Sequence, residues 1–215
     1  MKEKNLILAF AVLFLAAGAV TLVDAQTKPA YSHSAQKAFI PADLGKVYLG
    51  MPLRDFAKQI DITKAESDHR FSYLELNIPF AKGSITGLRV RVHGLTAEQL
   101  DAMHTEETVK KTGESGDEYE ATVKRPRAAA IPAEGVVYSM YIEFQDGFDL
   151  KSWAEKTYGK GEVRAANDEY HFYDQQWAKR SGDGLGWLIR AFYLGKGKSL
   201  QLLGRIPGTE WDPEA

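Results

Sequence analysis

The stretch Leu88-Arg89-Val90-Arg91-Val92-His93 alternates apolar and basic residues. A period of two is typical of a β-strand with one face in the core and the other in solvent. The segment 71–78 has the same period, and a short break at 79–83 separates the two. The pattern therefore predicts an antiparallel hairpin. Its outer face is basic and carries Arg89, Arg91 and His93.

Three short helices are predicted around and after this hairpin. Apolar residues at helical spacing follow Pro52, which suits a first helical position, so a helix is expected over 52–60. Thr96 and Gln99 have the spacing of a capping box, which predicts a second helix that ends near His104. Asp149 can cap a third helix that Gly159 ends.

The second half of the chain repeats this outline. Alternation over 138–144 predicts a strand, and three more strand-like segments follow near 169–177, 185–194 and 199–206. The polar stretch 105–117 is expected to be a loop. We therefore predict an α+β fold in which an antiparallel sheet is covered on one side by short helices, possibly as two pseudo-repeated helix-plus-strands halves. The expected halves are residues 43–125 and 136–208, with a joint at 126–135.

The N-terminal 25 residues have the layout of a secretory signal peptide. A short basic start precedes an uncharged run from Leu6 to Val23, and Val23-Asp24-Ala25 offers a cleavage site after Ala25. The run also reaches the lower length limit of a membrane span, so an uncleaved anchor is the alternative. Residues 26–42 are expected to be a flexible tether. The prediction is an exported protein, periplasmic or secreted, with no stable membrane span after cleavage.

Composition excludes several classes of function. Lys and Arg number 27 against 29 Asp and Glu, so the net charge of −2 gives no broad attraction to nucleic acid. The chain has no cysteine, which excludes disulfides, thiol catalysis and cysteine-bound metals. About 190 residues remain after the signal segment, which is enough to form a stable hydrophobic core without disulfides.

No motif specifies catalysis, a metal or a cofactor. None of the five histidines stands three or four residues from another, the spacing that presents paired ligands on a helix. No Gly-x-Ser-x-Gly elbow is present. A catalytic triad can also form from residues that are distant in sequence, so an exported hydrolase is the alternative function. The glycine-rich stretches at 182–186 and 195–198 separate strands, so hairpin turns explain them better than phosphate loops. We predict no catalytic, cofactor-binding or metal-binding residues.

Two surfaces are candidates for partner binding. Arg89, Arg91 and His93 share one strand face and could contact an acidic partner, or could instead pair with Glu75 on the neighbouring strand. Aromatic residues gather over 170–193, where apolar side chains occupy both faces of the strand at 185–194. Such residues serve either the core or an exposed platform for a partner. The aromatic candidates are Trp187 and Tyr193.

Gly50-Met51-Pro52 before a short helix and a hairpin resembles the opening of the small outer-membrane lipoprotein family that includes the smallest barrel-assembly accessory proteins. The paired helix-then-strands layout is similar to the tandem fold of the β-lactamase inhibitory protein. Either resemblance implies an exported adaptor or inhibitor that works by protein contact. The expected function is therefore a non-enzymatic binding protein of the cell envelope, acting through a sheet face or the loop 105–117. Another envelope or secreted protein is the expected partner, with a glycan as the second alternative.

Overall fold

A computed structural model describes residues 31–70, 73–113, 115–167, 169 and 171–205. Tyr31 begins the second of the two compact units into which the chain divides, and everything below concerns that unit. The expected signal peptide, residues 1–25, lies outside the described residues. Within them, no helix has the length and hydrophobicity needed to cross a membrane.

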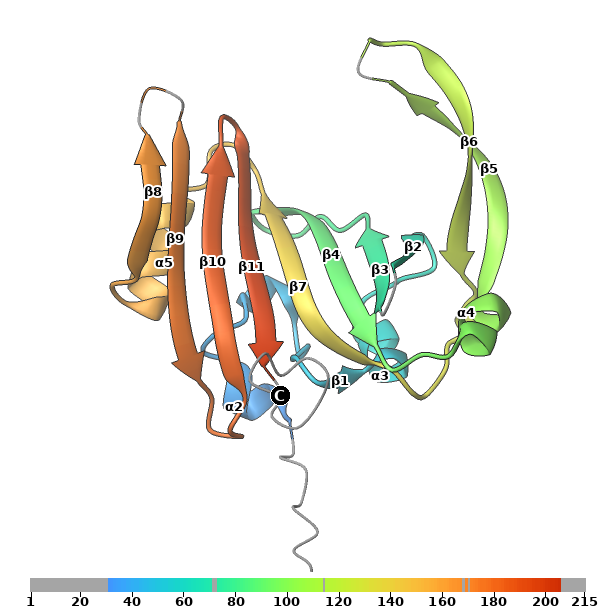
Figure 1. Ribbon diagram of the computed structural model, residues 1–215, viewed down its shortest axis with the longest axis horizontal. Helices are drawn as coiled ribbons and strands as arrows, with labels where there is room; N and C mark the ends of the chain where they lie inside the picture. The colour runs from blue at the N-terminus through green and yellow to red at the C-terminus, as the bar shows by residue number, and fades with distance from the viewer. Residues whose placement is uncertain (1–30, 71–72, 114, 168, 170, 206–215) are drawn as a thin grey trace, which may run out of the picture. The chain divides into compact units, whose positions relative to one another are not determined.

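The described unit is built on one antiparallel sheet of eleven strands (Figure 1). Its order is β5-β6-β2-β3-β4-β7-β11-β10-β9-β8, and the short β1 pairs separately with β7. The bounds are β1 (Met51–Pro52), β2 (Glu66–Arg70), β3 (Tyr73–Ile78), β4 (Ile85–His93), β5 (His104–Thr112), β6 (Glu118–Pro126), β7 (Val136–Phe144), β8 (Glu162–Asn167), β9 (Phe172–Arg180), β10 (Gly186–Leu194) and β11 (Gly197–Arg205).

The helices are short. They are α2 (His33–Gln36), α3 (Leu53–Gln59), α4 (Ala97–Met103) and α5 (Leu150–Tyr158), with 3-10 turns η2 (Ala42–Leu44) and η3 (Ala128–Ala130). The capping box predicted at Thr96 and Gln99 is confirmed at the start of α4, and Asp149 caps α5 by accepting from the Ser152 amide. Pro52 stands one position before the helix, as the N-cap of α3.

The predicted α+β class with helices covering the sheet is wrong, because the fold is dominated by its sheet. Strands make up 49% of the structure and helices 20%. The stretch 105–117, expected to be a loop, supplies β5 and the turn into β6. The expected joint at 126–135 does not interrupt the sheet, since β7 pairs with β4 on one side and β11 on the other.

Two of the strands that the sequence did not indicate, β5 and β8, were missed for the same physical reason. Six of the nine residues of β5 and all residues of β8 are exposed, and none is buried, so neither strand carries an alternating hydrophobic pattern. An alternating pattern arises only where one strand face is buried. The sequence of a strand that is solvated on both faces resembles that of a polar loop. The fraction of residues predicted to lie in strands was therefore too low.

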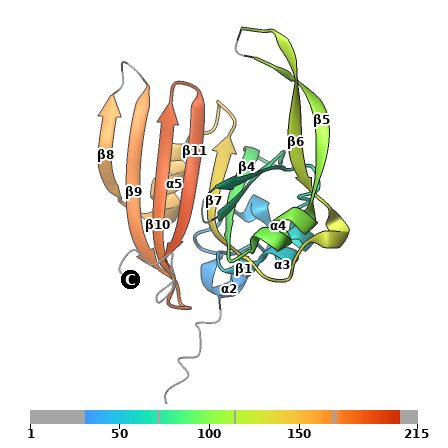
Figure 2. The same ribbon diagram turned by 45° about the vertical axis from the view of Figure 1, so that its right-hand side comes forward.

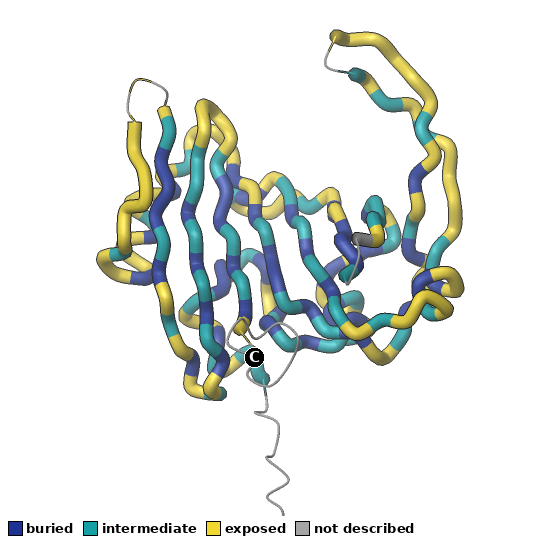
Figure 3. Tube along the Cα trace, in the orientation of Figure 1, coloured by how far each residue is buried: buried dark blue, intermediate teal, exposed yellow. Residues whose placement is uncertain are grey.

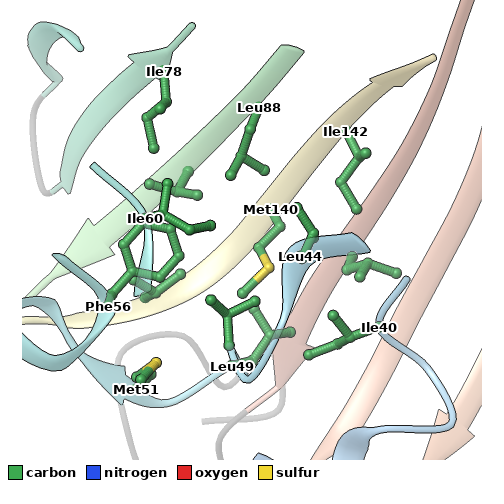
Figure 4. Close-up of a cluster of buried hydrophobic side chains, with 14 of the residues drawn as sticks. Ile40, Leu44, Leu49, Met51, Phe56, Ile60, Ile78, Leu88, Met140 and Ile142 are labelled. Atoms are coloured by element: carbon green, nitrogen blue, oxygen red, sulfur yellow. The ribbon is translucent and has the colours of Figure 1, made fainter. Parts of the chain in front are cut away.

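The hydrophobic core lies against one face of the sheet. Leu76, Val90, Met140, Leu202 and Ile189 face one another across β3, β4, β7, β11 and β10 in register, and all are at most 1% exposed. Figure 4 shows the side chain of Leu49 beside Met140 and that of Phe56 beside Ile60 in this cluster. Helices α3, α4 and α5 bury their apolar residues in the same cluster. We call this side of the sheet the core face.

The segment expected to be a tether is folded from Tyr31 onward. The side chain of Gln36, fully buried, accepts from the amide of Leu49 at 2.8 Å and donates to its carbonyl at 3.0 Å. Ile40 belongs to the core cluster, and Phe39 packs on Trp187. One buried side-chain amide and two apolar side chains hold the segment in place. So few buried residues give no periodic pattern, and the sequence therefore did not predict that this segment is folded.

Candidate binding face

The face of the sheet opposite the core carries a row of polar side chains in register. Six residues lie directly opposite one another, one on each of six neighbouring strands. Directly opposed residues of an antiparallel pair point to the same side, so all six side chains share one face of the sheet. At the usual strand separation the row is about 24 Å long. We call it the polar row and its side of the sheet the open face. Its members are Asn77, Arg89, Tyr141, Gln201, Arg190 and Gln176.

The described helices leave the open face uncovered. Their buried apolar residues all belong to the cluster on the core face, and Figure 1 draws α5 behind β9. Five of the six polar-row residues are half-buried, and Asn77 is exposed. Half-buried side chains on an uncovered face lie along the sheet rather than extending into solvent. The row is therefore an ordered polar surface.

Arg190 is held at one side of the row by an acid from β9. Its Nε and Nη2 donate to Asp174 Oδ1 and Oδ2 at 2.8 and 2.7 Å, and its guanidinium lies 5.3 Å from the centre of the Phe192 ring. The carboxylate bonds outweigh the effect of burial and raise the pKa of Arg190. Such a two-point pair fixes the plane of the guanidinium.

Glu75 on β3 holds Arg91 on β4 through a single hydrogen bond. Nε of Arg91 donates to Glu75 Oε2 at 3.0 Å, and its guanidinium lies 4.8 Å from the centre of the Tyr73 ring. The Glu75 carboxylate is only 8% exposed. Burial works against the charge of Arg91, but the bond to Glu75 prevails and raises its pKa. The pairing with Glu75 that the sequence suggested is present.

Arg89 differs from both of these arginines. Its Nε lies 3.8 Å from Glu75 Oε1, too far for a hydrogen bond, and this buried nitrogen has no partner. The guanidinium lies 5.1 Å from the centre of the Tyr141 ring. It makes no hydrogen bond to any residue in the described part of the chain. Stacking and one nearby charge thus position five donors that no described group uses.

A groove opens at the Arg89 end of the polar row. Its volume is about 450 Å³, and Asn77, Arg89 and Glu143 contribute to its wall. Glu66 and Arg125 also line the groove, and both already have ionic partners on β5. Lys111 donates to Glu66 at 2.6 Å, and Arg125 pairs with Glu107. Two groove cations therefore make no side-chain hydrogen bond to a described residue, the exposed Lys64 and the half-buried Arg89, and of these only Arg89 belongs to the polar row.

The five predicted partner-binding residues separate onto two faces. Arg89, Arg91 and His93 lie together on the open face, where the His93 ring is 6.4 Å from that of Tyr138. Trp187 is 2% exposed and packs on Phe39 at 5.1 Å, and so belongs to the core. Tyr193 stacks on Tyr173 at 5.2 Å, on the side where Lys151 of α5 lies over the Tyr173 ring.

The phenol of Tyr138 lies at the edge of this basic cluster. Its ring meets Tyr73 at 6.3 Å. Burial raises the pKa of Tyr138, Arg91 works against that rise, and the neighbouring Tyr73 and Glu75 add to it. The phenol is therefore neutral at physiological pH and can donate a hydrogen bond on the open face.

The polar row itself was not predicted. Arg190 and Gln201 occupy alternate positions of segments that were correctly expected to be strands, and that alternation was the available signal. Which residue faces which across five strand pairs depends on register, and register depends on turns and bulges. The bulge between Arg91 and Val92 is one such feature.

The described residues show no cluster suited to a metal ion, and the Ser181–Asp183 pair has a structural role. They contain no group of three or more His, Asp or Glu side chains placed to hold a metal ion. Ser181 donates to Asp183, but this pair belongs to the turn before β10, where Asp183 also accepts from Gln36 at 3.0 Å. Burial opposes ionisation of Asp183, yet these hydrogen bonds lower its pKa. The hydrolase alternative stays a prediction.

No family model, curated protein or solved structure matches this chain. The resemblance to the small outer-membrane lipoproteins and to the β-lactamase inhibitory protein therefore stays a prediction, as does export. The functional argument rests on the geometry of the open face.

Proposed function

We propose that this protein is an exported, non-enzymatic binding protein that holds an acidic segment of another envelope or secreted protein on its open face. The observation that carries the proposal is Arg89. Its guanidinium is positioned by Tyr141 and Glu75 and makes no hydrogen bond to a described residue. A carboxylate from a partner would accept two of these donors side by side.

The length and chemistry of the polar row favour an extended polypeptide. A row of about 24 Å corresponds to about seven residues of extended chain. Gln201, Tyr141 and Asn77 make no hydrogen bond to a described residue, and their amide and phenol groups both donate and accept. A peptide lying across the strands would meet these groups in succession, with its acid at Arg89.

The charges nearest the groove favour an acid rather than a base. Arg89 and Arg91 share the single carboxylate of Glu75, whereas Arg190 is neutralised by Asp174. The groove is also lined by the bases Lys64 and Arg125 and by the acids Glu66 and Glu143, so the groove and this cluster together hold four bases and three acids, an excess of one positive charge. Complementary charge at such a site gives specificity and faster association.

The proposal is tested by titrating the protein with an oligoglutamate peptide at low ionic strength and recording the backbone amide spectrum. The amides of β3, β4, β7 and β11 are expected to shift. Arg89→Gln should weaken binding at least ~10-fold, equivalent to ~1.4 kcal/mol. The matched control is Arg164→Gln, because Arg164 is an exposed arginine on β8 outside the polar row.

Two outcomes would contradict the proposal. In one, Arg89→Gln and Arg164→Gln weaken oligoglutamate binding equally, which would mean that only general charge attraction is at work. In the other, oligolysine or a polyuronate glycan binds the open face more tightly than oligoglutamate. A photo-crosslinker placed at position 201 would then identify the natural partner in cells, with Arg89→Gln as the negative control.

A further inference from the structure

Strand β5 ends the sheet, and its outer edge has no partner among the described residues. It pairs with β6 over nine residues without a bulge. All but three of its residues are exposed, and Figure 3 shows the β5–β6 ribbon as the most continuously exposed pair of strands. An unpaired edge of this length is a template for another strand.

The ribbon is weakly attached to the rest of the sheet. A single residue pair, Ser67 with Lys124, joins β2 to β6. Figure 2 shows much of the β5–β6 ribbon standing apart from the neighbouring strands. The ion pair between Lys111 and Glu66 and the hydrogen bond from Arg125 Nη1 to the Lys64 carbonyl add two side-chain contacts. Two-stranded ribbons are marginally stable in water, and further strands are what stabilise them. A strand added at β5 would supply this missing partner.

The sequence of β5 says which strand fits. Residues 106–111 read Glu-Glu-Thr-Val-Lys-Lys, with two acids, two uncharged residues and two bases. When such a strand runs antiparallel to itself, its acidic end lies beside the basic end of its neighbour. We propose that the β5 edge pairs with the β5 edge of a second copy of this chain to form a two-fold symmetric dimer.

Symmetry restricts the register of this pairing. A two-fold axis between two antiparallel edge strands puts the same sheet face of both copies on the same side. Directly opposed residues must also point to the same side, so the residue at the axis lies opposite its own copy. Centred on Thr108, the pairing sets Thr108 opposite its own copy and Glu106 opposite Lys110 of the second copy. Glu106 and Lys110 are both exposed and form no ion pair with a described residue. Opposed threonines and opposite charges are favourable cross-strand pairs.

The other end of the sheet is built differently. Strand β8 carries a register irregularity between Val163 and Ala165, and such bulges are a common means of preventing edge pairing. Strand β5 has no bulge and no proline. Its charges would repel many strands, but they complement a second copy.

The test is sedimentation velocity over a range of protein concentrations, using the protein purified from cells that express the full chain. Wild type is expected to dimerise reversibly. Glu106→Lys and Lys110→Glu should each weaken the dimer at least ~10-fold, because each places like charges opposite one another twice. Glu120→Lys is the matched control, because exposed Glu120 on β6 lies opposite Lys110, so its reversal creates the same kind of like-charge pair within the ribbon without changing the β5 edge.

Mixing the two weakened variants provides the discriminating result. In the mixed dimer the introduced lysine of one chain faces the introduced glutamate of the other, so the 1:1 mixture should dimerise close to wild type. A wild type that stays monomeric at all concentrations overturns the proposal. So does a dimer that neither Glu106→Lys nor Lys110→Glu weakens, or a mixture that shows no rescue.

Discussion

Arg190 and Asp174 form a two-point ion pair across β10 and β9, with N–O distances of 2.8 and 2.7 Å. The Asp174 side chain is 10% exposed and that of Arg190 is 39% exposed. The acid is thus desolvated while the base keeps some contact with water. This asymmetry determines how each partner responds to loss of the other.

Replacing Asp174 is expected to lower the free energy of unfolding. Asp174→Ala leaves the half-buried Arg190 without its acceptor, and residual hydration limits the expected loss to about 1–3 kcal/mol. The control is Glu162→Ala, which breaks the exposed pair of Glu162 with Arg164 and should change stability by less than about 0.5 kcal/mol. Urea denaturation measures both. Equal losses in the two variants would show that the Asp174 pair contributes no more than a surface pair.

Gly161 is expected to tolerate no side chain. A Cβ there would lie 2.7 Å from the backbone oxygen of Gln176 and would also meet the ring of Trp177, which is fixed by its bond to the Gly159 carbonyl at 2.8 Å. Gly161→Ala should therefore cost about 1–3 kcal/mol of unfolding free energy. Gly182→Ala is the control, because a Cβ at Gly182 has nothing within 4 Å. If both substitutions prove neutral by thermal denaturation, the close packing at Gly161 is not present in solution.

His104 makes stability depend on pH at the start of β5. Its Nδ1 lies 2.6 Å from the Leu100 carbonyl, and its buried Nε2 has no described partner. Burial is the main cause that lowers the pKa of His104 below its ordinary value of 6.5. Lys124 and His69 lower it further, whereas the Leu100 carbonyl and Asp101 work against them. In the folded protein the imidazole is therefore harder to protonate than in the unfolded chain.

The sign of the pH effect follows from this difference. Above pH 6.5 both states hold His104 neutral and its contribution is constant. As pH falls from 6.5 to the lowered folded pKa, the unfolded chain binds the proton first, so stability declines by up to about 1.4 kcal/mol per pH unit. His104→Gln should flatten this part of the profile when urea midpoints are compared between pH 7.5 and 5. An unchanged slope in His104→Gln would assign the acid sensitivity to other groups.

The sequence predicted the strands and helices that bury one face. Leu74, Leu76 and Ile78 are buried in β3 and Leu88, Val90 and Val92 in β4, as their alternation indicated. The capping box at Thr96 and the hairpin turns between the last three strands were also predictable, because each depends on residues close in sequence. Strands exposed on both faces, β5 and β8, gave no such signal.

The candidate site was only partly predictable for a related reason. Arg89 and Arg91 could be placed on one strand face, since a period of two is visible in sequence. That Arg91 takes the hydrogen bond of Glu75 and Arg89 does not is set by distances of 3.0 and 3.8 Å. The aromatic cluster around Trp187 looked equally suited to a surface, and only its contact with Phe39, nearly 150 residues earlier in the chain, places it in the core.

The sequence by itself determined local structure here: the alternating strands, the helix caps and the glycine turns, all of which involve residues a few positions apart. Tertiary structure decided the strand order, the register that aligns six polar residues across the open face, and which arginine keeps its donors unused. These features depend on pairings between distant strands, where a shift of one residue moves every side chain to the opposite face.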